Sequence, residues 1–164
     1  MKIANIHTQP ECIPEIAAWL QQEWGHLSPE KTLDDRIRHL SERCRNDDLP
    51  VTFIAIADDE NVGTVSLVPH DLKSRMDLTP WVAAVFVKPE ARGRGIGSRL
   101  VGFAEAEAQR RGIPTLYLFT PDKQRMYARL GWTTIEEVEY RGEHVTVMTK
   151  SCPPVANPAV PASQ

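Results

Sequence analysis

The chain is poor in the features that mark secreted, membrane and nucleic-acid-binding proteins. Its 164 residues hold only three cysteines, too widely spaced for a disulfide framework or a zinc site. No run of about 18 apolar residues occurs, and the N-terminus lacks a basic segment followed by an apolar one. The formal net charge of -3 argues against general affinity for nucleic acid or an anionic membrane. We therefore expect a cytoplasmic protein with no metal, no nucleic-acid partner and no membrane association.

What the chain does contain is an ordinary globular composition, with 41% apolar and 25% charged residues. Its length fits one domain with a single core. We assign this domain to residues 1–150, and expect it to be a monomer or a homodimer. Residues 151–164 are rich in proline and alanine and contain no aromatic residue, so they predict a disordered tail.

The order of secondary structure follows from hydrophobic periodicity and from turn residues. The second helix carries Leu33, Ile37, Leu40 and Cys44 on one face, and it begins either at Ser28 with Pro29 or at Thr32 with Asp35. The other expected helices are 14–25, 96–112 and 121–131, and the expected strands are 3–7, 51–57, 62–68, 81–87, 115–120, 133–140 and 144–150.

The strand 81–87, "WVAAVFV", has no polar alternation, which is typical of a central strand covered on both faces. Directly after it, "EARGRGIGSRLV" places Gly93, Gly95 and Gly97 before a helix that starts near Ser98. Free backbone N–H groups then converge at the start of a helix, where the helix dipole is positive. Such a turn predicts an anion site.

Arginines add full positive charge to this turn, and two other phosphate motifs fail to match it. Arg92, Arg94 and Arg99 supply the charge. The nucleoside triphosphate loop requires a lysine followed by Ser or Thr after its last glycine, and this turn lacks both. The dinucleotide fingerprint requires an acidic residue after the next strand, and "LYLFT" has none.

The turn resembles the acetyl-CoA signature of the Gcn5-related N-acetyltransferase (GNAT) superfamily, Arg/Gln-x-x-Gly-x-Gly/Ala after a central strand. Here it reads Arg92-Gly93-Arg94-Gly95-Ile96-Gly97. A second family feature, a tyrosine four residues before a glycine and aromatic pair, appears as Tyr127 followed by Gly131 and Trp132. The order of elements over residues 1–150 is also similar to that of the family.

The resemblance implies an α/β (α+β) fold with a mixed, mostly antiparallel sheet of about seven strands, flanked by four helices and splayed between strands four and five. Acetyl-CoA would lie in that cleft. The implied cofactor-binding residues are strand-four groups that pair with the pantetheine arm, amides that hold the pyrophosphate, and Thr120, which stands where relatives often have asparagine. These are Val85, Phe86, Val87, Arg92, Gly93, Arg94, Gly95, Ile96, Gly97, Ser98 and Thr120.

The implied activity is transfer of the acetyl group to a primary amine by direct attack in a ternary complex. Tyr127 would donate a proton or hydrogen bond to the departing sulfur, and a strand-four amide would support the carbonyl oxygen. Strand four offers no carboxylate as the general base, so the candidates are His70, Asp71, Asp77, Glu23 and His26, or a water molecule. The alternative is a non-catalytic acyl-CoA-binding sensor or regulatory module.

The acceptor remains open between a small cationic amine and a peptide or protein amine. A carboxylate-rich rim around the expected acceptor pocket would favour a cationic amine. The residues expected at this rim are Glu23, Asp71, Asp77, Glu136, Glu137, Glu139 and Glu143. An equally simple interpretation is that these carboxylates are the solvated faces of strands and loops.

Overall fold

A computed structural model describes residues 1–42 and 48–154 of the chain. Within them, seven strands form one sheet in the order β1-β2-β3-β4-β5-β7-β6, in which only β4 and β5 are parallel neighbours. The strands are β1 (Lys2–Asn5), β2 (Val51–Ala57), β3 (Glu60–Val68), β4 (Trp81–Val87), β5 (Thr115–Thr120), β6 (Thr133–Tyr140) and β7 (Glu143–Ser151). The α-helices are α1 (Ile13–Trp24), α2 (Leu33–Glu42), α3 (Ile96–Arg110) and α4 (Gln124–Arg129).

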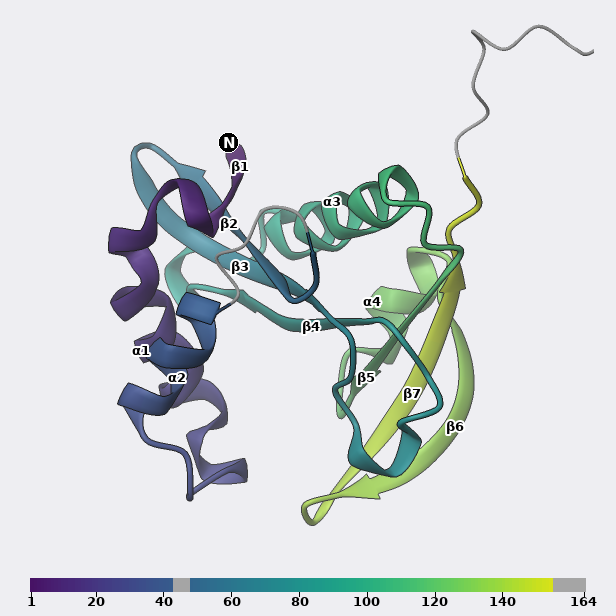
Figure 1. The fold of residues 1–164 in the computed structure, drawn as a ribbon. Coiled ribbons are helices and arrows are strands. Elements are labelled where there is room, and N and C mark those ends of the chain that lie inside the picture. Colours follow the sequence, from purple (N-terminus) through teal and green to yellow (C-terminus); the bar gives the residue numbers. More distant parts are fainter. Residues whose placement is uncertain (43–47, 155–164) are drawn as a thin grey trace, which may run out of the picture.

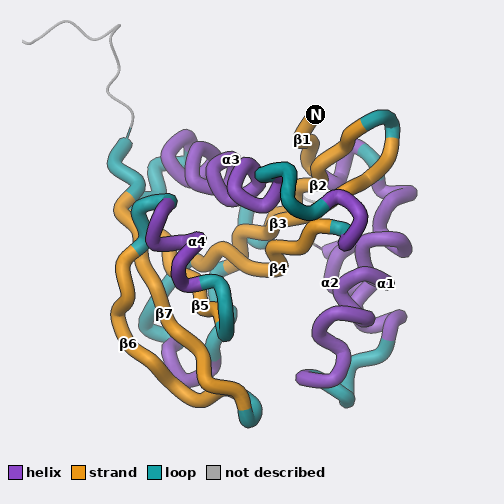
Figure 2. Tube along the Cα trace, turned by 180° about the vertical axis from the view of Figure 1, so that it is seen from behind, coloured by secondary structure: helices purple, strands orange, loops and turns teal. Residues whose placement is uncertain are grey.

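Helices cover both faces of the sheet because the side chains of its central strands alternate between two apolar clusters. Ile54 of β2 and Phe86 of β4 pack with the buried faces of α1 and α2. Phe53 of β2 instead packs in a second cluster with α3 and α4. Figures 1 and 2 show α1 and α2 together at one side of the molecule, and α3 and α4 behind the sheet. The expectation of a central strand covered on both faces is confirmed for β4.

The sheet splits between its fourth and fifth strands, as expected. β4 pairs with β3 from Trp81 to Val87, and β5 pairs with β7 along its whole length. Between β4 and β5, in contrast, the described pairing is confined to Trp81 and Tyr117. Figure 1 shows the two strands diverging from this point.

An irregularity in β4 lies on the open part of this split. The register with β3 shifts so that Thr64 pairs with Phe86 but Ser66 pairs with Ala83, which places one extra residue in β4. Ala84 has φ 53°, a left-handed conformation that costs an L-residue free energy. A β-bulge of this kind bends its strand, which is consistent with the departure of β4 from β5.

Local sequence signals placed most element ends within two or three residues. The second helix begins with the Thr32 and Asp35 pair: Thr32 N–H donates to Asp35 Oδ2 at 2.9 Å, and Asp35 N–H donates to Thr32 Oγ1 at 3.0 Å. Cys44, expected on that helix, lies outside the described residues. β7 ends at Ser151, and the buried Cys152 donates its N–H to Pro114 O at 2.7 Å. The expected tail was residues 151–164; Ser151 and Cys152 belong to the folded part of the chain, and residues 155–164 lie outside the described residues.

Candidate active site

The N-terminal end of α3, together with the glycine turn before it, is rich in free backbone amides. Gly93 and Gly95 have φ of 79° and 76°, the left-handed region that glycine adopts without strain. Arg99 N–H donates to Gly95 O at 3.1 Å, so the amides of Ile96, Gly97 and Ser98 precede the first intrahelical bond. No side chain caps this end within the described residues. These amides are therefore available to an anion.

Space as well as backbone conformation favours a ligand at this turn. A Cβ built on Gly93 or on Gly95 would meet no atom within 4 Å, so both glycines border open space. Gly97 differs, because its φ is not in the left-handed region and a Cβ there would make an ordinary 3.7 Å contact with Val87. The requirement for glycine is thus conformational at two of the three positions.

Arg92 supports the end of β4 with its side chain. Its Nε donates to Val87 O at 2.9 Å, and its guanidinium carbon lies 5.5 Å from the centre of the Phe86 ring. Arg94 and Arg99 are exposed. Of the three arginines whose charge was assigned to the turn, Arg92 is therefore partly engaged by the protein, and the positive charge available to an anion comes mainly from the other two.

The main chain of β4 presents alternate residues to the open cleft. Lys88 N–H donates to Val62 O of β3, and Phe86 O points at Gly63, also of β3. Because neighbouring residues of a regular strand point their N–H and C=O groups in opposite directions, Val87 turns its groups away from β3, and its carbonyl accepts the Arg92 hydrogen bond. Among the three expected pantetheine contacts, Val87 therefore faces away from β3, Phe86 contributes a side chain on the α1 face, and the bulge at Ala84 interrupts the alternation before Val85.

Tyr127 lies on α4, across the split from the glycine turn. It is 6% exposed, and its ring packs edge-on against Trp132 at a centroid distance of 6.1 Å. Burial, with a smaller contribution from Asp122, raises the pKa of the Tyr127 phenol to about 12. The phenol thus keeps its proton through the physiological pH range, and it is suited to donating a hydrogen bond.

Thr120 begins the turn that leads into α4. Its Oγ1 accepts hydrogen bonds from Lys123 N–H at 3.0 Å and from Asp122 N–H at 3.4 Å. The residue is 4% exposed. Its hydroxyl oxygen therefore holds the start of α4, and with it the helix that carries Tyr127.

Arg75 pairs with two carboxylates of the expected acidic rim. Arg75 holds Asp77 with two hydrogen bonds of 3.0 Å and Glu136 with one of 2.6 Å. These hydrogen bonds from Arg75 lower the pKa of Asp77 below its ordinary value, which makes Asp77 a weaker base. Glu137 pairs with His144 at 3.6 Å. Asp77 and Glu136 thus share the single positive charge of Arg75, so this part of the rim keeps a net negative charge.

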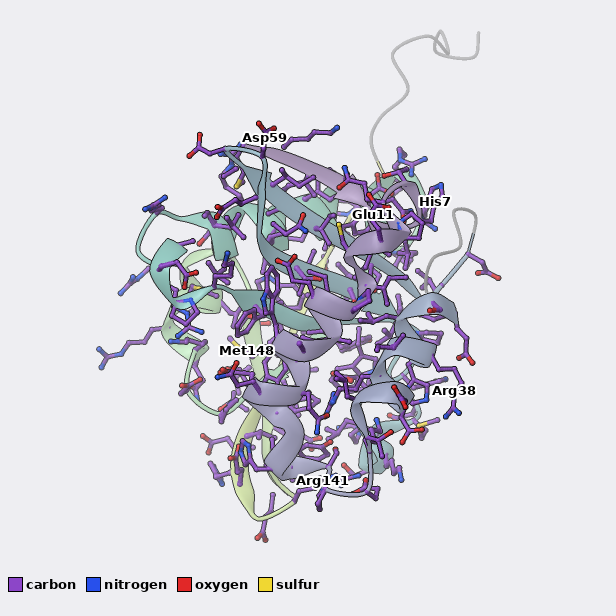
Figure 3. The ribbon with its side chains drawn as sticks, turned by 90° about the vertical axis from the view of Figure 1, so that its left-hand side faces the viewer. His7, Glu11, Arg38, Asp59, Arg141 and Met148 are labelled. Carbon is purple, nitrogen blue, oxygen red and sulfur yellow. The ribbon has the colours of Figure 1, made fainter. Side chains whose placement is uncertain are left out.

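The turn between β6 and β7 reaches the connection between α1 and α2. Arg141 Nη1 donates to Leu27 O at 2.8 Å and to Glu30 Oε1 at 3.1 Å. Beside it, His26 lies 3.8 Å from Glu143. Figure 3 shows Arg141 near the end of this helical pair. Of the base candidates, Asp77 is therefore engaged by Arg75, and His26 lies near Glu143.

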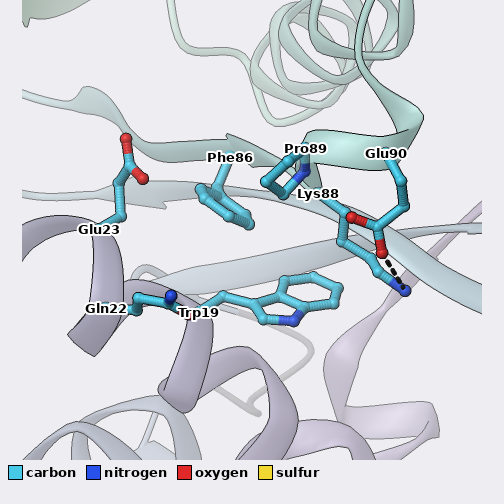
Figure 4. A pocket seen from close by; sticks show the side chains of 7 residues that line it. All are labelled: Trp19, Gln22, Glu23, Phe86, Lys88, Pro89 and Glu90. Atoms are coloured by element: carbon cyan, nitrogen blue, oxygen red, sulfur yellow. Dashed lines mark ion pairs between the residues drawn. The ribbon is translucent and has the colours of Figure 1, made fainter.

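A pocket of about 340 Å³ lies between α1 and the end of β4. Figure 4 shows its walls, with the Trp19 and Phe86 rings between the carboxylates of Glu23 and Glu90. Its lining residues are Trp19, Gln22, Glu23, Phe86, Lys88, Pro89 and Glu90. The sequence pointed to Glu23 and Phe86 separately and not to the other lining residues, because no spacing along the chain connects a helix at residue 20 with a strand end at residue 88.

A sheet that splits beside an amide-rich helix start is the arrangement expected of a coenzyme A-dependent acyltransferase. The chain belongs to the acetyltransferase (GNAT) family, whose family model matches residues 13–132. The fold is accordingly the GNAT fold, with a mixed seven-stranded sheet and four helices in the described residues.

Individual relatives agree with this assignment. An acetyltransferase, Atu2258, of Agrobacterium fabrum (strain C58) is 38% identical over 84 residues, which cover 50% of this chain and 58% of that protein. The structure of an aminoglycoside 6'-N-acetyltransferase complexed with coenzyme A has a TM-score of 0.74 at 19% identity, covering 96% of this chain and 100% of the other. A ribosomal-protein-alanine N-acetyltransferase from Brucella melitensis has a TM-score of 0.71 at 19% identity, covering 92% and 99%.

Among the helices of residues 1–42 and 48–154, none combines the length and the apolar character that crossing a bilayer requires.

Proposed function

We propose that the chain transfers the acetyl group of acetyl-CoA to a primary amine. The observation that carries this proposal is the free-amide turn at residues 92–98, at the end of β4 where the sheet opens. Membership of the GNAT family and the likeness to an acetyltransferase complexed with coenzyme A support it. The acceptors named for two similar structures, an aminoglycoside and a ribosomal-protein alanine, are both amines.

The residues fit acetyl-CoA, which supplies an activated acetyl thioester and an anionic pyrophosphate. The amides from Gly93 to Ser98 would bind the pyrophosphate, with Arg94 and Arg99 as counter-ions. Val85 and Val87 would pair with the pantetheine arm through main-chain groups, as an added strand pairs with a sheet edge. Specificity for the arm then needs no special side chains on β4.

Tyr127 would hold the proton needed by the departing sulfur. Its phenol stays protonated because burial raises its pKa to about 12. A donor with so high a pKa stabilises developing negative charge chiefly by a hydrogen bond. The acceptor amine must be neutral to attack, and no cysteine lies in the turn or on α4, so direct attack is the simplest route.

Release of free thiol from acetyl-CoA tests the proposed function. The acceptor panel should contain polyamines, aminoglycosides, amino acids, and peptides with free N-termini or lysines. Acceptor-dependent release that is lost in Tyr127→Phe supports a transferase with Tyr127 in a catalytic role. Binding of acetyl-CoA without release for any acceptor would contradict the transferase and favour an acyl-CoA sensor.

A further inference from the structure

The pocket between α1 and β4 contains one carboxylate without a counter-ion. Lys88 Nζ lies 3.5 Å from Glu90 Oε1 and 3.7 Å from Glu60 Oε2, so this ammonium is matched by two carboxylates. Glu23 makes no ion pair or hydrogen bond within the described part of the chain. Glu23 is exposed and lines the pocket on the side of the Phe86 ring opposite to Lys88 (Figure 4).

Counting the nearby cations leaves the pocket negative. Besides Lys88, the second cation is Arg92, whose guanidinium lies over the Phe86 ring and whose Nε is bound to Val87 O. Three carboxylates, those of Glu23, Glu60 and Glu90, stand against these two positive charges. Glu60 and Glu90 share the single charge of Lys88, and Arg92 is engaged by the Phe86 ring and by Val87 O, so neither cation is paired with Glu23.

The position of Glu23 on its helix increases the local negative potential. Glu23 is in the last turn of α1, which has no basic residue. The carbonyl groups at a helix C-terminus carry partial negative charge, and a carboxylate there is unfavourable unless a cation is near. A bound cation would therefore interact favourably with both Glu23 and the end of α1.

The aromatic walls fit the rest of a small, flexible amine. The Trp19 and Phe86 rings lie at a centroid distance of 5.6 Å and an interplanar angle of 33°, and Trp24 contacts Phe86 edge-on. These rings present an apolar surface to a methylene chain. A volume of about 340 Å³ is near the lower end of the range of small-ligand pockets, about 300–1,000 Å³.

We infer that this pocket binds a second, non-reacting ammonium of the acceptor, with Glu23 as its counter-ion, and that the preferred acceptors are small diamines or polyamines. The inference rests on the proposed transferase function. In this arrangement the methylene chain lies on Trp19 and Phe86, and the reacting nitrogen extends toward the bulge of β4 at Ala84. Glu23 acts in binding. Its loss should therefore weaken binding of acceptors that carry a second ammonium, and should have little effect on acceptors that carry only the reacting amine.

The test compares cadaverine with pentylamine, which have the same five-carbon chain and differ by one terminal ammonium. For the unchanged protein we expect kcat/KM to favour cadaverine by about tenfold, the contribution of one charge-assisted hydrogen bond. Glu23→Gln should reduce this preference to less than about twofold, through KM. Glu15→Gln removes the same charge from an exposed position earlier on α1, and the preference should survive it.

Calorimetric titration of cadaverine into the CoA-bound protein gives a readout that needs no acetyl transfer. We expect the Kd for cadaverine to rise by about tenfold in Glu23→Gln and to stay unchanged in Glu15→Gln. This result would support the pocket even if no thiol release were detected, so the inference and the proposed function can fail separately. Acetyl transfer with equal kcat/KM for the two amines would overturn the inference and leave the transferase intact. A preference abolished by Glu90→Gln but retained in Glu23→Gln would overturn it as well.

Discussion

The two halves of the split sheet carry different parts of the candidate site. The half formed by β1–β4 with α1–α3 holds the groups proposed to bind ligands: the amides of residues 93–98, the main chain of β4 and the pocket at Glu23. The half formed by β5–β7 with α4 holds the proposed proton donor, Tyr127. Binding and proton donation are therefore encoded by segments that meet only when the halves are placed together.

Both apolar and polar contacts join these halves. Leu118, Tyr127 and Trp132 of the β5–β7 half pack in the same apolar cluster as the buried face of α3. The polar contacts include Arg75 with Glu136, Arg141 with Glu30, and an ion pair between Glu105 of α3 and Lys150 of β7. The halves thus differ in the groups that they carry, and the predictions below use this difference.

The largest expected effect concerns the proton donor of the β5–β7 half. Tyr127→Phe should lower kcat by about 10²–10⁴, the usual contribution of a general acid. The Kd for acetyl-CoA should change by less than about twofold, because the binding groups lie on the other half. Steady-state kinetics and calorimetry measure the two quantities. Unchanged kcat would remove Tyr127 from the mechanism.

The second prediction concerns stability at high pH. The pKa of Tyr127 is raised from 10.0 to about 12 in the folded state, so the folded protein holds this proton more tightly than the unfolded chain. Stability from this group is fully present below pH 10 and is lost as the pH rises toward 12, by about 2–3 kcal/mol. Denaturant unfolding measures the free energy of unfolding of the unchanged protein and of Tyr127→Phe at matched pH values. If this free energy fell equally with pH in both proteins, the contribution assigned to Tyr127 would be wrong.

The third prediction concerns the glycine turn of the β1–β4 half. Gly95→Ala places a Cβ at φ 76°, which costs about 1–2 kcal/mol in an L-residue, and directs it into the open space assigned to the pyrophosphate. The Kd for acetyl-CoA should rise by about tenfold. Gly102→Ala is the matched control on α3, since its Cβ meets no atom within 4 Å and its φ is helical. Equal Kd values for the two variants would argue against ligand binding at the turn.

The smallest expected effect concerns the contacts between the halves. Arg75→Ala removes partly exposed pairs with Asp77 and Glu136, so the loss of stability should be at most about 1 kcal/mol, or about 2–4 °C in Tm. The loss should shrink at high salt. Lys73→Ala, an exposed neighbour in the same loop, should change Tm by less. A similar shift in both variants would mean that the Arg75 contacts contribute nothing measurable.

The local features of the molecule followed from sequence because each depends on a few adjacent residues. Gly93 and Gly95 stand where the backbone needs positive φ. Thr32 and Asp35, three residues apart, bond to each other's backbone N–H groups and cap the start of α2. The uniform apolar run at residues 81–87 indicated a strand covered on both faces. The split between β4 and β5 was predicted only from the family resemblance, because no local pattern distinguishes a strand paired on both edges from one paired on a single edge.

The charge state of the site was decided by tertiary structure alone. Asp77 and Glu23 are both acidic residues, and the sequence does not distinguish them. In the structure Arg75 binds Asp77, whereas no cation in the described residues binds Glu23. Hydrophobic patterning and turn chemistry act over a few residues, so the sequence determined the elements and the anion-binding turn. Coulomb interactions act through space over a few ångströms, so only the folded chain decided which carboxylates remain free to bind a ligand.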